Sequence, residues 1–233
     1  MLPCVISIFA HPSSIFISKI CANLCKNMIV IIDYGMGNLR NVEKACEVLG
    51  AKAKVSDSVG VIKKAKKIIF PGVGNFGEAV KELRKRKIFD TLIQTANSGV
   101  PFFGICVGMQ LLLEASEEAP GVKGLGLLEG KVKKFNAKKI IVPHMGWNQA
   151  HSAKRIAQSG KNLFNGILDG SYFYFAHSYY CDIKDKEAVL ATTQYDIDFV
   201  SACHKKNIWG VQFHPEKSQK LGLKLFDNFL NLC

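Results

Sequence analysis

Three short apolar runs, each followed by a glycine-containing turn and a segment of helical periodicity, constrain the fold of this chain more than any other feature. They span residues 28–33, 68–70 and 100–105. Strands buried on both faces of a sheet appear as continuous apolar runs rather than as alternating ones. The order predicts an α/β fold with a mostly parallel central sheet flanked by helices, and functional residues at the carboxyl ends of its strands.

The segments between and after these runs complete the predicted order. Residues 39–49 and 76–83 carry apolar side chains on one helical face, and residues 107–118 have the same spacing, which predicts a helix reaching Glu118. The last third of the chain changes character and favours an antiparallel extension of the sheet followed by a helix. Its predicted strands are residues 171–181, 188–195, 199–204 and 208–213, and the final helix covers about 219–232.

The first 27 residues differ from the rest of the chain. They contain broken apolar stretches without a well-formed signal peptide, and a clean strand begins only at Met28. We expect residues 1–27 to be a disordered leader or the result of a misplaced start codon, and residues 28–233 to form one domain. No run approaches the roughly 18 apolar residues of a membrane span, so no membrane association is expected.

The formal net charge is +12, and basic residues gather in residues 63–67, 81–87 and 131–139. These runs alternate with apolar residues and lack an aromatic-rich RNA-binding signature, which favours solvated faces over a nucleic-acid site. A basic rim facing a phosphorylated substrate on a partner subunit is the alternative. The eight cysteines include no CxxC pair, so we expect reduced thiols in the cytoplasm and no bound metal.

The sequence GICVG at residues 104–108 has the pattern of a nucleophile elbow with a thiol in place of the usual hydroxyl. It stands between a predicted strand and a predicted helix, as that motif requires. A thiol at a helix amino terminus also favours the thiolate, the reactive form. Buried structural cysteines are common, so the pentapeptide alone leaves both a catalytic and a structural Cys106 open.

Two further segments carry residues that could form a catalytic site together with Cys106. The sequence HPE places His214 and Glu216 two residues apart at the end of a predicted strand, where the histidine can shuttle a proton and the carboxylate can orient it. The turn PGVG at residues 71–74 ends a neighbouring strand. We expect an oxyanion hole from the N–H group of Val107 and that of Val73 or Gly74.

The sequences GICVGMQ at residues 104–110 and HPE at residues 214–216 resemble those of the class I glutamine amidotransferases. The sequences DYGMGN, EAPG, PHMGWN and HSY narrow the resemblance to glutaminase subunits that work with a separate synthase of histidine biosynthesis. They stand at residues 33–38, 118–121, 143–148 and 177–179. The resemblance runs from Met28 almost to Cys233 and implies a class I glutamine amidotransferase-like, flavodoxin-like fold.

The resemblance implies that Cys106 attacks the side-chain amide of L-glutamine, with His214 as acid and base and Glu216 as the orienting carboxylate. It also implies an enzyme without a cofactor. The substrate-binding residues that it implies are Gln110, Glu118, Ser178 and Tyr179. The ammonia would be channelled to a synthase (cyclase) subunit with a (β/α)8 barrel, in a heterodimer. The residues that it places at this partner are Pro143, His144, Met145, Trp147 and Asn148, and aromatic anchors suit an interface.

Three other readings remain open at this point. The chain could be a glutaminase that feeds an amidotransferase of surface-sugar biosynthesis. It could be another cysteine hydrolase built on the same elbow, such as a peptidase or deglycase. It could also be a catalytically silent binding module that keeps the fold.

Overall fold

The computed structural model describes residues 28–136, 138, 140–153 and 162–231. The predicted leader, residues 1–27, lies outside the described residues. In chain order the strands are β1 (Ile29–Ile32), β2 (Ala53–Ser56), β3 (Lys67–Gly72), β4 (Phe102–Cys106), β5 (Ala115–Ser116), β6 (Gly130–Lys134), β7 (His144–Ser152), β8 (Ser171–His177), β9 (Tyr179–Ile183), β10 (Val189–Tyr195), β11 (Ile197–Lys205) and β12 (Ile208–Val211). The α-helices are α2 (Leu39–Val48), α3 (Val59–Ile62), α4 (Phe76–Lys85), α5 (Phe89–Asn97), α6 (Val107–Gln110) and α7 (Gln219–Asn231), and the 3-10 helices are η2 (Lys186–Ala188) and η3 (Pro215–Lys217).

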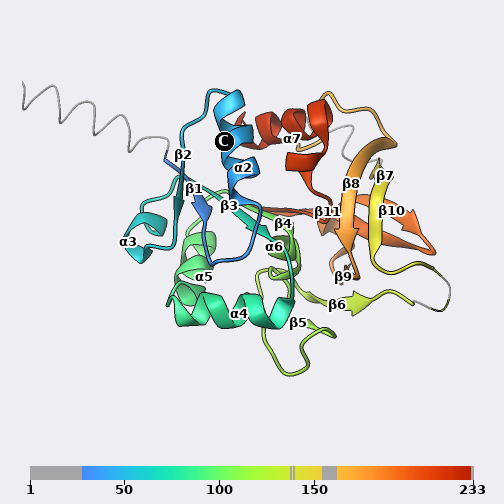
Figure 1. Ribbon diagram of the computed structural model, residues 1–233, viewed down its shortest axis with the longest axis horizontal. Helices are drawn as coiled ribbons and strands as arrows, with labels where there is room; N and C mark the ends of the chain where they lie inside the picture. Colours follow the sequence, from blue (N-terminus) through green and yellow to red (C-terminus); the bar gives the residue numbers. More distant parts are fainter. Residues whose placement is uncertain (1–27, 137, 139, 154–161, 232–233) are drawn as a thin grey trace, which may run out of the picture.

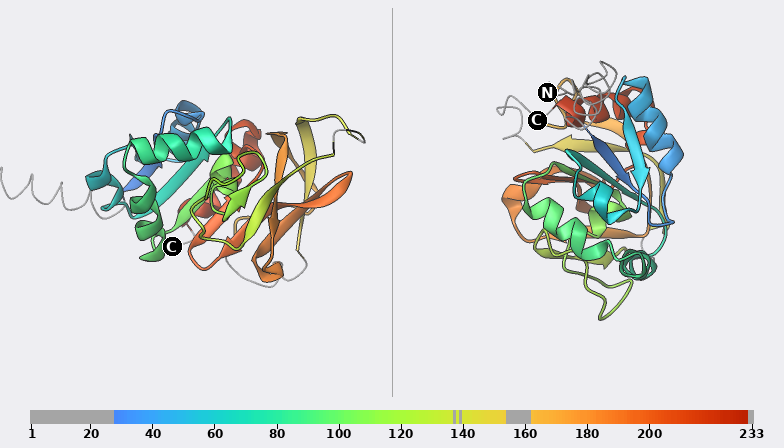
Figure 2. Two further views of the ribbon diagram at one scale, coloured as in Figure 1. Left: turned by 90° about the horizontal axis from the view of Figure 1, so that it is seen from below. Right: turned by 90° about the vertical axis from the view of Figure 1, so that its left-hand side faces the viewer.

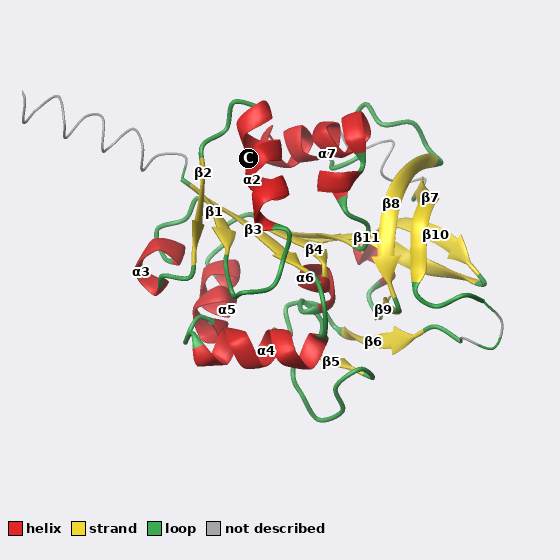
Figure 3. Ribbon diagram, viewed as in Figure 1, coloured by secondary structure: helices red, strands yellow, loops and turns green. Residues whose placement is uncertain are grey.

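Within the described residues these strands join in one sheet, with the main order β2-β1-β3-β4-β12-β11-β10-β7-β8. The first five strands run parallel, and the pairs from β12 to β8 are antiparallel. Helices α2 and α7 lie on one side of the parallel part and α4 and α5 on the other (Figures 1 and 3). The antiparallel strands continue the sheet beyond β12, at the end of the parallel part that lies away from β2 (Figure 2). This arrangement confirms the predicted fold class.

The inner parallel strands are largely apolar because helices cover both of their faces. All four residues of β1 and all five of β4 are buried. Phe103 on β4 packs against Phe226 and Phe229 of α7, with ring centroids 5.9 and 4.9 Å apart. Burying such large side chains drives the helix onto the sheet.

The register of three neighbouring strands brings their carboxyl ends to one place. Gly72 at the end of β3 pairs with Cys106 at the end of β4, and Val211 at the end of β12 pairs with Ile105. Segments that follow these strands therefore emerge side by side, although about 140 residues separate the first from the last.

The predicted helix over residues 107–118 is wrong beyond Gln110, where α6 ends. The next three residues, Leu111, Leu112 and Leu113, are all fully buried. Their carbonyl oxygens accept hydrogen bonds from residues 125–128 instead of from a following helical turn. A run that is buried on every side can show helical spacing without being a helix.

The tail also differs in detail from its prediction. Residues 171–181 form two strands rather than one, because the chain leaves β8 at His177 and begins β9 at Tyr179. Strand β8 pairs with β7, whereas β9 pairs with β6 and β11. The sequence patterns did not indicate β2, β6 or β7, whose residues are mostly half-buried or exposed.

Candidate active site

Cys106 lies at the sharp turn between β4 and α6. Its backbone has φ 55° and ψ −112°, a sparsely populated conformation for a residue with a side chain. Such strain typically costs about 1–3 kcal/mol and persists where the surrounding structure enforces it. A Cβ atom on Gly104 would lie 2.7 Å from the Gly108 oxygen, and one on Gly108 would collide with the Phe70 carbonyl. The two glycines thus let the elbow pack tightly against β3.

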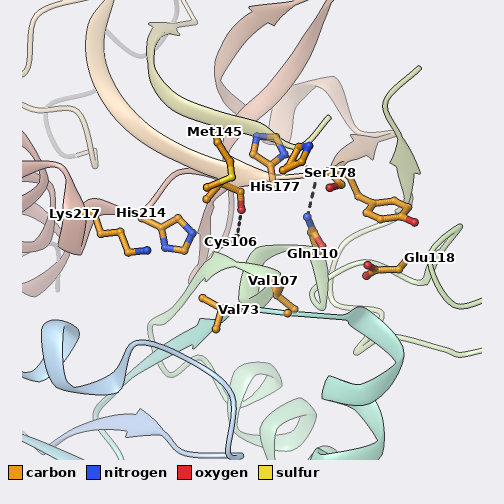
Figure 4. A pocket seen from close by; sticks show the side chains of 14 residues that line it. Val73, Cys106, Val107, Gln110, Glu118, Met145, His177, Ser178, His214 and Lys217 are labelled. Carbon is orange, nitrogen blue, oxygen red and sulfur yellow. Dashed lines mark hydrogen bonds between the residues drawn. The ribbon is translucent and has the colours of Figure 1, made fainter. Parts of the chain in front are cut away.

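His214 and Glu216 follow β12 and form a buried pair. Nδ1 of His214 lies 2.8 Å from Oε1 of Glu216, and each side chain is 2% exposed. Because a carboxylate oxygen accepts, Nδ1 carries the proton that it receives and the other ring nitrogen is free to face the sulfur. The side chain of Cys106 also acts on the imidazole of His214 and raises its pKa. Figure 4 shows the His214 ring beside Cys106.

The charges around His214 favour its protonated form. Burial lowers the pKa of His214, but the charge and hydrogen bond of Cys106, together with Glu216, outweigh it and raise this pKa to about 10. At neutral pH the imidazole in this arrangement is therefore a cation next to the sulfur. It is ready to hand a proton to a leaving amine.

A cavity of about 450 Å³ opens over this pair (Figure 4). Both Cys106 and His214 line it, and Glu216 lies behind His214. The other predicted site residues that line the cavity are Val73, Gly74, Val107, Gln110, Glu118, Ser178, Tyr179, Pro143 and Met145. The fold thus brings eleven of the fifteen predicted site residues around one space large enough for a small metabolite.

The predicted oxyanion turn lies directly beside the nucleophile. Val73 and Gly74 follow Gly72, the residue paired with Cys106. Gly74 has φ +100°, a conformation that favours glycine, and a Cβ atom there would lie 2.8 Å from the Met36 side chain. Both residues line the cavity together with Val107.

The predicted substrate-binding residues are partly engaged by the protein itself. Nε2 of Gln110 donates to the Tyr179 carbonyl at 3.1 Å and to Oε1 of Gln212 at 3.1 Å, so the Gln110 side-chain oxygen remains as an acceptor. Oε2 of Glu118 accepts from the N–H of Phe76 at 2.7 Å. This bond fixes the Glu118 carboxylate at the start of α4, on the wall of the cavity.

The predicted partner segment differs from expectation at one residue. Met145 and Trp147 are 65% and 48% exposed, as an interface would require, but the His144 side chain is buried. The alternation of β7 turns His144 inward, where its Nδ1 lies 3.1 Å from Nε2 of His177. Asn148 is half-buried, and its Nδ2 contacts His144 at 3.2 Å.

Four residues at the site were not among those predicted. Ala176, His177 and Lys217 line the cavity, and Nε2 of Gln212 lies 3.7 Å from the sulfur of Cys106. Lys217 follows the HPE sequence directly and Gln212 stands two residues before its histidine, so their place in the chain was the available signal. For Ala176 the sequence offered none, because its backbone oxygen is what approaches Cys106 at 4.0 Å.

The other free cysteines of the described part have a different environment. Burial raises the pKa of Cys46 and of Cys203 to about 12, and that of Cys181 well above its usual value. Among these described thiols Cys106 alone lines the cavity. The described residues include no group of three or more potential metal ligands. None of the helices that the structure describes is both long and apolar enough to cross a bilayer.

Comparison with known proteins gives concordant results. The family model "Glutamine amidotransferase class-I" matches residues 30–232. The chain is 48% identical to "Imidazole glycerol phosphate synthase subunit HisH" of Desulfitobacterium hafniense (strain Y51), over 87% of this chain and 93% of that protein. It is also 48% identical to the protein of the same name from Pyrococcus furiosus, over 88% of this chain and 98% of that protein.

Solved structures with low sequence identity share the fold. A glutamine amidotransferase crystal structure superposes with a TM-score of 0.68 at 21% identity, covering 87% of this chain and 97% of that one. A chain of PurLQS from Thermotoga maritima gives 0.67 at 20% identity, covering 88% and 98%. Since the family model spans nearly the whole described chain and relatives reach almost half identity, the chain belongs to the class I glutamine amidotransferase family.

Proposed function

We propose that this chain is the glutaminase subunit of imidazole glycerol phosphate synthase. It hydrolyses L-glutamine to glutamate and ammonia, and the ammonia passes to a synthase subunit that makes imidazole glycerol phosphate and AICAR in histidine biosynthesis. The observation that carries this proposal is the 44–48% identity to subunits of that name over 93–100% of their length. The geometry around Cys106 supports the same chemistry.

In the proposed mechanism the Cys106 thiolate attacks the side-chain amide carbon of glutamine. The electron pair of the carbonyl moves to its oxygen, where N–H groups of Val107 and of Val73 or Gly74 stabilise the charge. His214 gives its proton to the nitrogen, ammonia leaves, and a glutamyl thioester remains. A water that gives a proton to His214 then hydrolyses the thioester, while Glu216 stabilises the imidazolium.

The polar groups of the cavity suit the zwitterionic end of glutamine. The carboxylate of Glu118 can pair with the α-ammonium group, and the free side-chain oxygen of Gln110 can accept a hydrogen bond from it. Ser178 and Tyr179 line the side of the cavity that faces Gln110, where they would contact the bound amino acid.

The partner in this proposal is a synthase (cyclase) subunit with a (β/α)8 barrel, bound as a heterodimer in the cytoplasm. The contact surface would include Pro143, Met145, Trp147 and Asn148, with His144 supporting it from beneath. Pro143 and Met145 also line the cavity, so this surface borders the place where ammonia forms. An enclosed path from cavity to partner would keep ammonia from bulk water.

The experiment is to purify the chain from Met28 together with the candidate barrel subunit and to measure glutamate release with and without the barrel's ribonucleotide ligand. We expect rapid release in the complex with the ribonucleotide and very slow release by the isolated chain. Cys106→Ser should abolish both. Robust turnover by the isolated chain would contradict the dependence on the partner, and no turnover in any complex would contradict the function.

A further inference from the structure

The backbone oxygen of Tyr179 receives two side chains. Nε2 of Gln110 lies 3.1 Å away and Nδ1 of His177 lies 2.7 Å away. A carbonyl oxygen can only accept, so both nitrogens must donate. The Gln110 amide is therefore held with its nitrogen toward Tyr179, because a reversed amide would place its own oxygen against the Tyr179 carbonyl oxygen.

The direction of the Gln110 amide sets that of Gln212. The same nitrogen of Gln110 donates to Oε1 of Gln212 at 3.1 Å, which requires the oxygen of Gln212 to face Gln110. Its nitrogen must then point the other way, and it lies 3.7 Å from the sulfur of Cys106. Gln212 is fully buried, and its backbone N–H donates to Ser201 at 2.9 Å.

We propose that Gln212 is a second hydrogen-bond donor to the Cys106 thiolate, beside His214, and that it helps keep the sulfur in its reactive form; this rests on the proposed role of Cys106 as nucleophile. The Cys106 residue is only 3% exposed, so water supplies few of the donors that a charged sulfur needs. The neighbouring Ala176 oxygen, 4.0 Å away, would repel it. An N–H aimed at an anion is stronger than a neutral hydrogen bond.

Gln212 neither gives up nor takes a proton in this role. When the sulfur bonds to the amide carbon, its negative charge moves to the carbonyl oxygen and the hydrogen bond from Gln212 weakens. The contribution is therefore to the population of the thiolate before attack. A variant without the donor should need a higher pH to reach the same reactivity.

The test is the pH dependence of alkylation of Cys106 by iodoacetamide in the full chain, followed on the Cys106 peptide by mass spectrometry. In Gln212→Met, which has a similar length but no donor, we expect the midpoint to move up by about one pH unit, so that alkylation at any pH well below the midpoint is slowed about tenfold. The matched control is Gln149→Met. Nε2 of Gln149 donates to the Gly170 carbonyl rather than to sulfur, so its midpoint should not move.

An unchanged midpoint in folded Gln212→Met would overturn the proposal, as would an equal shift in Gln149→Met. If Gln212→Met does not fold, the same titration is made on Gln110→Leu. This variant keeps Gln212 but removes the amide group that orients the Gln212 side chain. We then expect a smaller upward shift, and no shift would again reject the proposal. Alkylation needs neither glutamine nor the barrel, so an expected shift without glutamate release in any complex would reject only the proposed function.

Discussion

The ring of His214 and the carboxylate of Glu216 meet through one hydrogen bond, 2.8 Å long and shielded from water. The second carboxylate oxygen of Glu216 is buried and has no hydrogen-bond partner within the described part of the chain. The contact with His214 is therefore the interaction through which Glu216 acts. It fixes the tautomer of the ring and faces the other nitrogen toward the sulfur.

Glu216→Gln should lower kcat for glutamate release by about 10²- to 10⁴-fold, because the amide neither stabilises the imidazolium nor enforces the tautomer. The measurement is made on the complex with the barrel subunit and its ribonucleotide. Glu47→Gln, an exposed residue in a surface ion pair with Lys44, is the matched control and should keep full activity. Retention of more than about a tenth of kcat in Glu216→Gln would refute this role.

Cys106→Ala should lower the pKa of His214 from about 10 by at least about one unit. The sulfur and Glu216 raise this pKa against the lowering by burial, so removal of the sulfur leaves burial less opposed. The measurement is an NMR titration of the histidine rings. An unchanged pKa of His214 would show that the sulfur does not stabilise its charge.

Two buried histidines should make the fold sensitive to acid. Burial lowers the pKa of His144 to about 4, and burial together with neighbouring His144 and His214 lowers that of His177 to about 3, against the hydrogen bond to Tyr179. Both stay neutral in the folded chain while their unfolded forms take up protons below about pH 6.5. Stability should therefore fall as the pH drops from about 6.5 toward 4, by about 2 kcal/mol per histidine at pH 5.

Urea unfolding at pH 7 and pH 5 measures this loss. In His144→Gln the loss of unfolding free energy between the two pH values should be smaller than in the unchanged chain by about 2 kcal/mol. Val48→Ala, which changes an exposed residue of α2 that cannot titrate, should keep the full difference. A flat profile in the unchanged chain would mean that the two rings are not held neutral.

Gly108→Ala should destabilise the fold by about 2–4 kcal/mol, because the added methyl group would collide with the Phe70 carbonyl. Gly60→Ala in α3 is the matched control. Its nearest neighbour would be the Ser58 hydroxyl at 3.9 Å, and alanine should change stability by less than about 1 kcal/mol there. Chemical denaturation measures the free energy of unfolding of both variants. Equal values for Gly108→Ala and Gly60→Ala would argue against close packing of the elbow.

Trp147→Ala should weaken binding of the barrel subunit by about 2 kcal/mol or more, roughly 30-fold in Kd. The thermal midpoint of the isolated chain should change little, because Trp147 is 48% exposed on β7. Val48→Ala, exposed on α2 away from this strand, should bind normally. Isothermal titration calorimetry measures both. Undiminished binding by Trp147→Ala would place the interface elsewhere.

The parallel half of the fold could be predicted because its strands are buried on both faces. The fully apolar runs around β1 and β4 need no knowledge of their neighbours to be recognised. Strand β7 escaped prediction because exposed and buried residues mix along it without a regular pattern. The helix predicted through residues 111–113 is absent because hydrogen bonds from residues 125–128, rather than from a following helical turn, satisfy their carbonyl groups.

For the candidate site, motif residues such as Cys106 and His214 could be predicted from chemistry that needs these types of side chain. Their catalytic roles stay predictions, and the structure adds the distances that make them testable. The contact of Gln212 with the sulfur could not be predicted, since it depends on which amide atom faces Gln110. The orientation of the Gln110 amide is set in turn by the backbone oxygen of Tyr179, which is distant in the sequence.

The β-ladder that joins Gly72 to Cys106 limits how the proposed oxyanion turn, Val73 and Gly74, can respond to a partner. Strand β3, which ends at Gly72, is held in the same sheet as Cys106. A change in the direction of the backbone N–H donors must therefore occur within Val73 and Gly74. Rotation of one peptide plane is a small, local movement that leaves the core undisturbed. Binding of a partner can therefore change the backbone of these two residues alone, without a shift of the sheet itself.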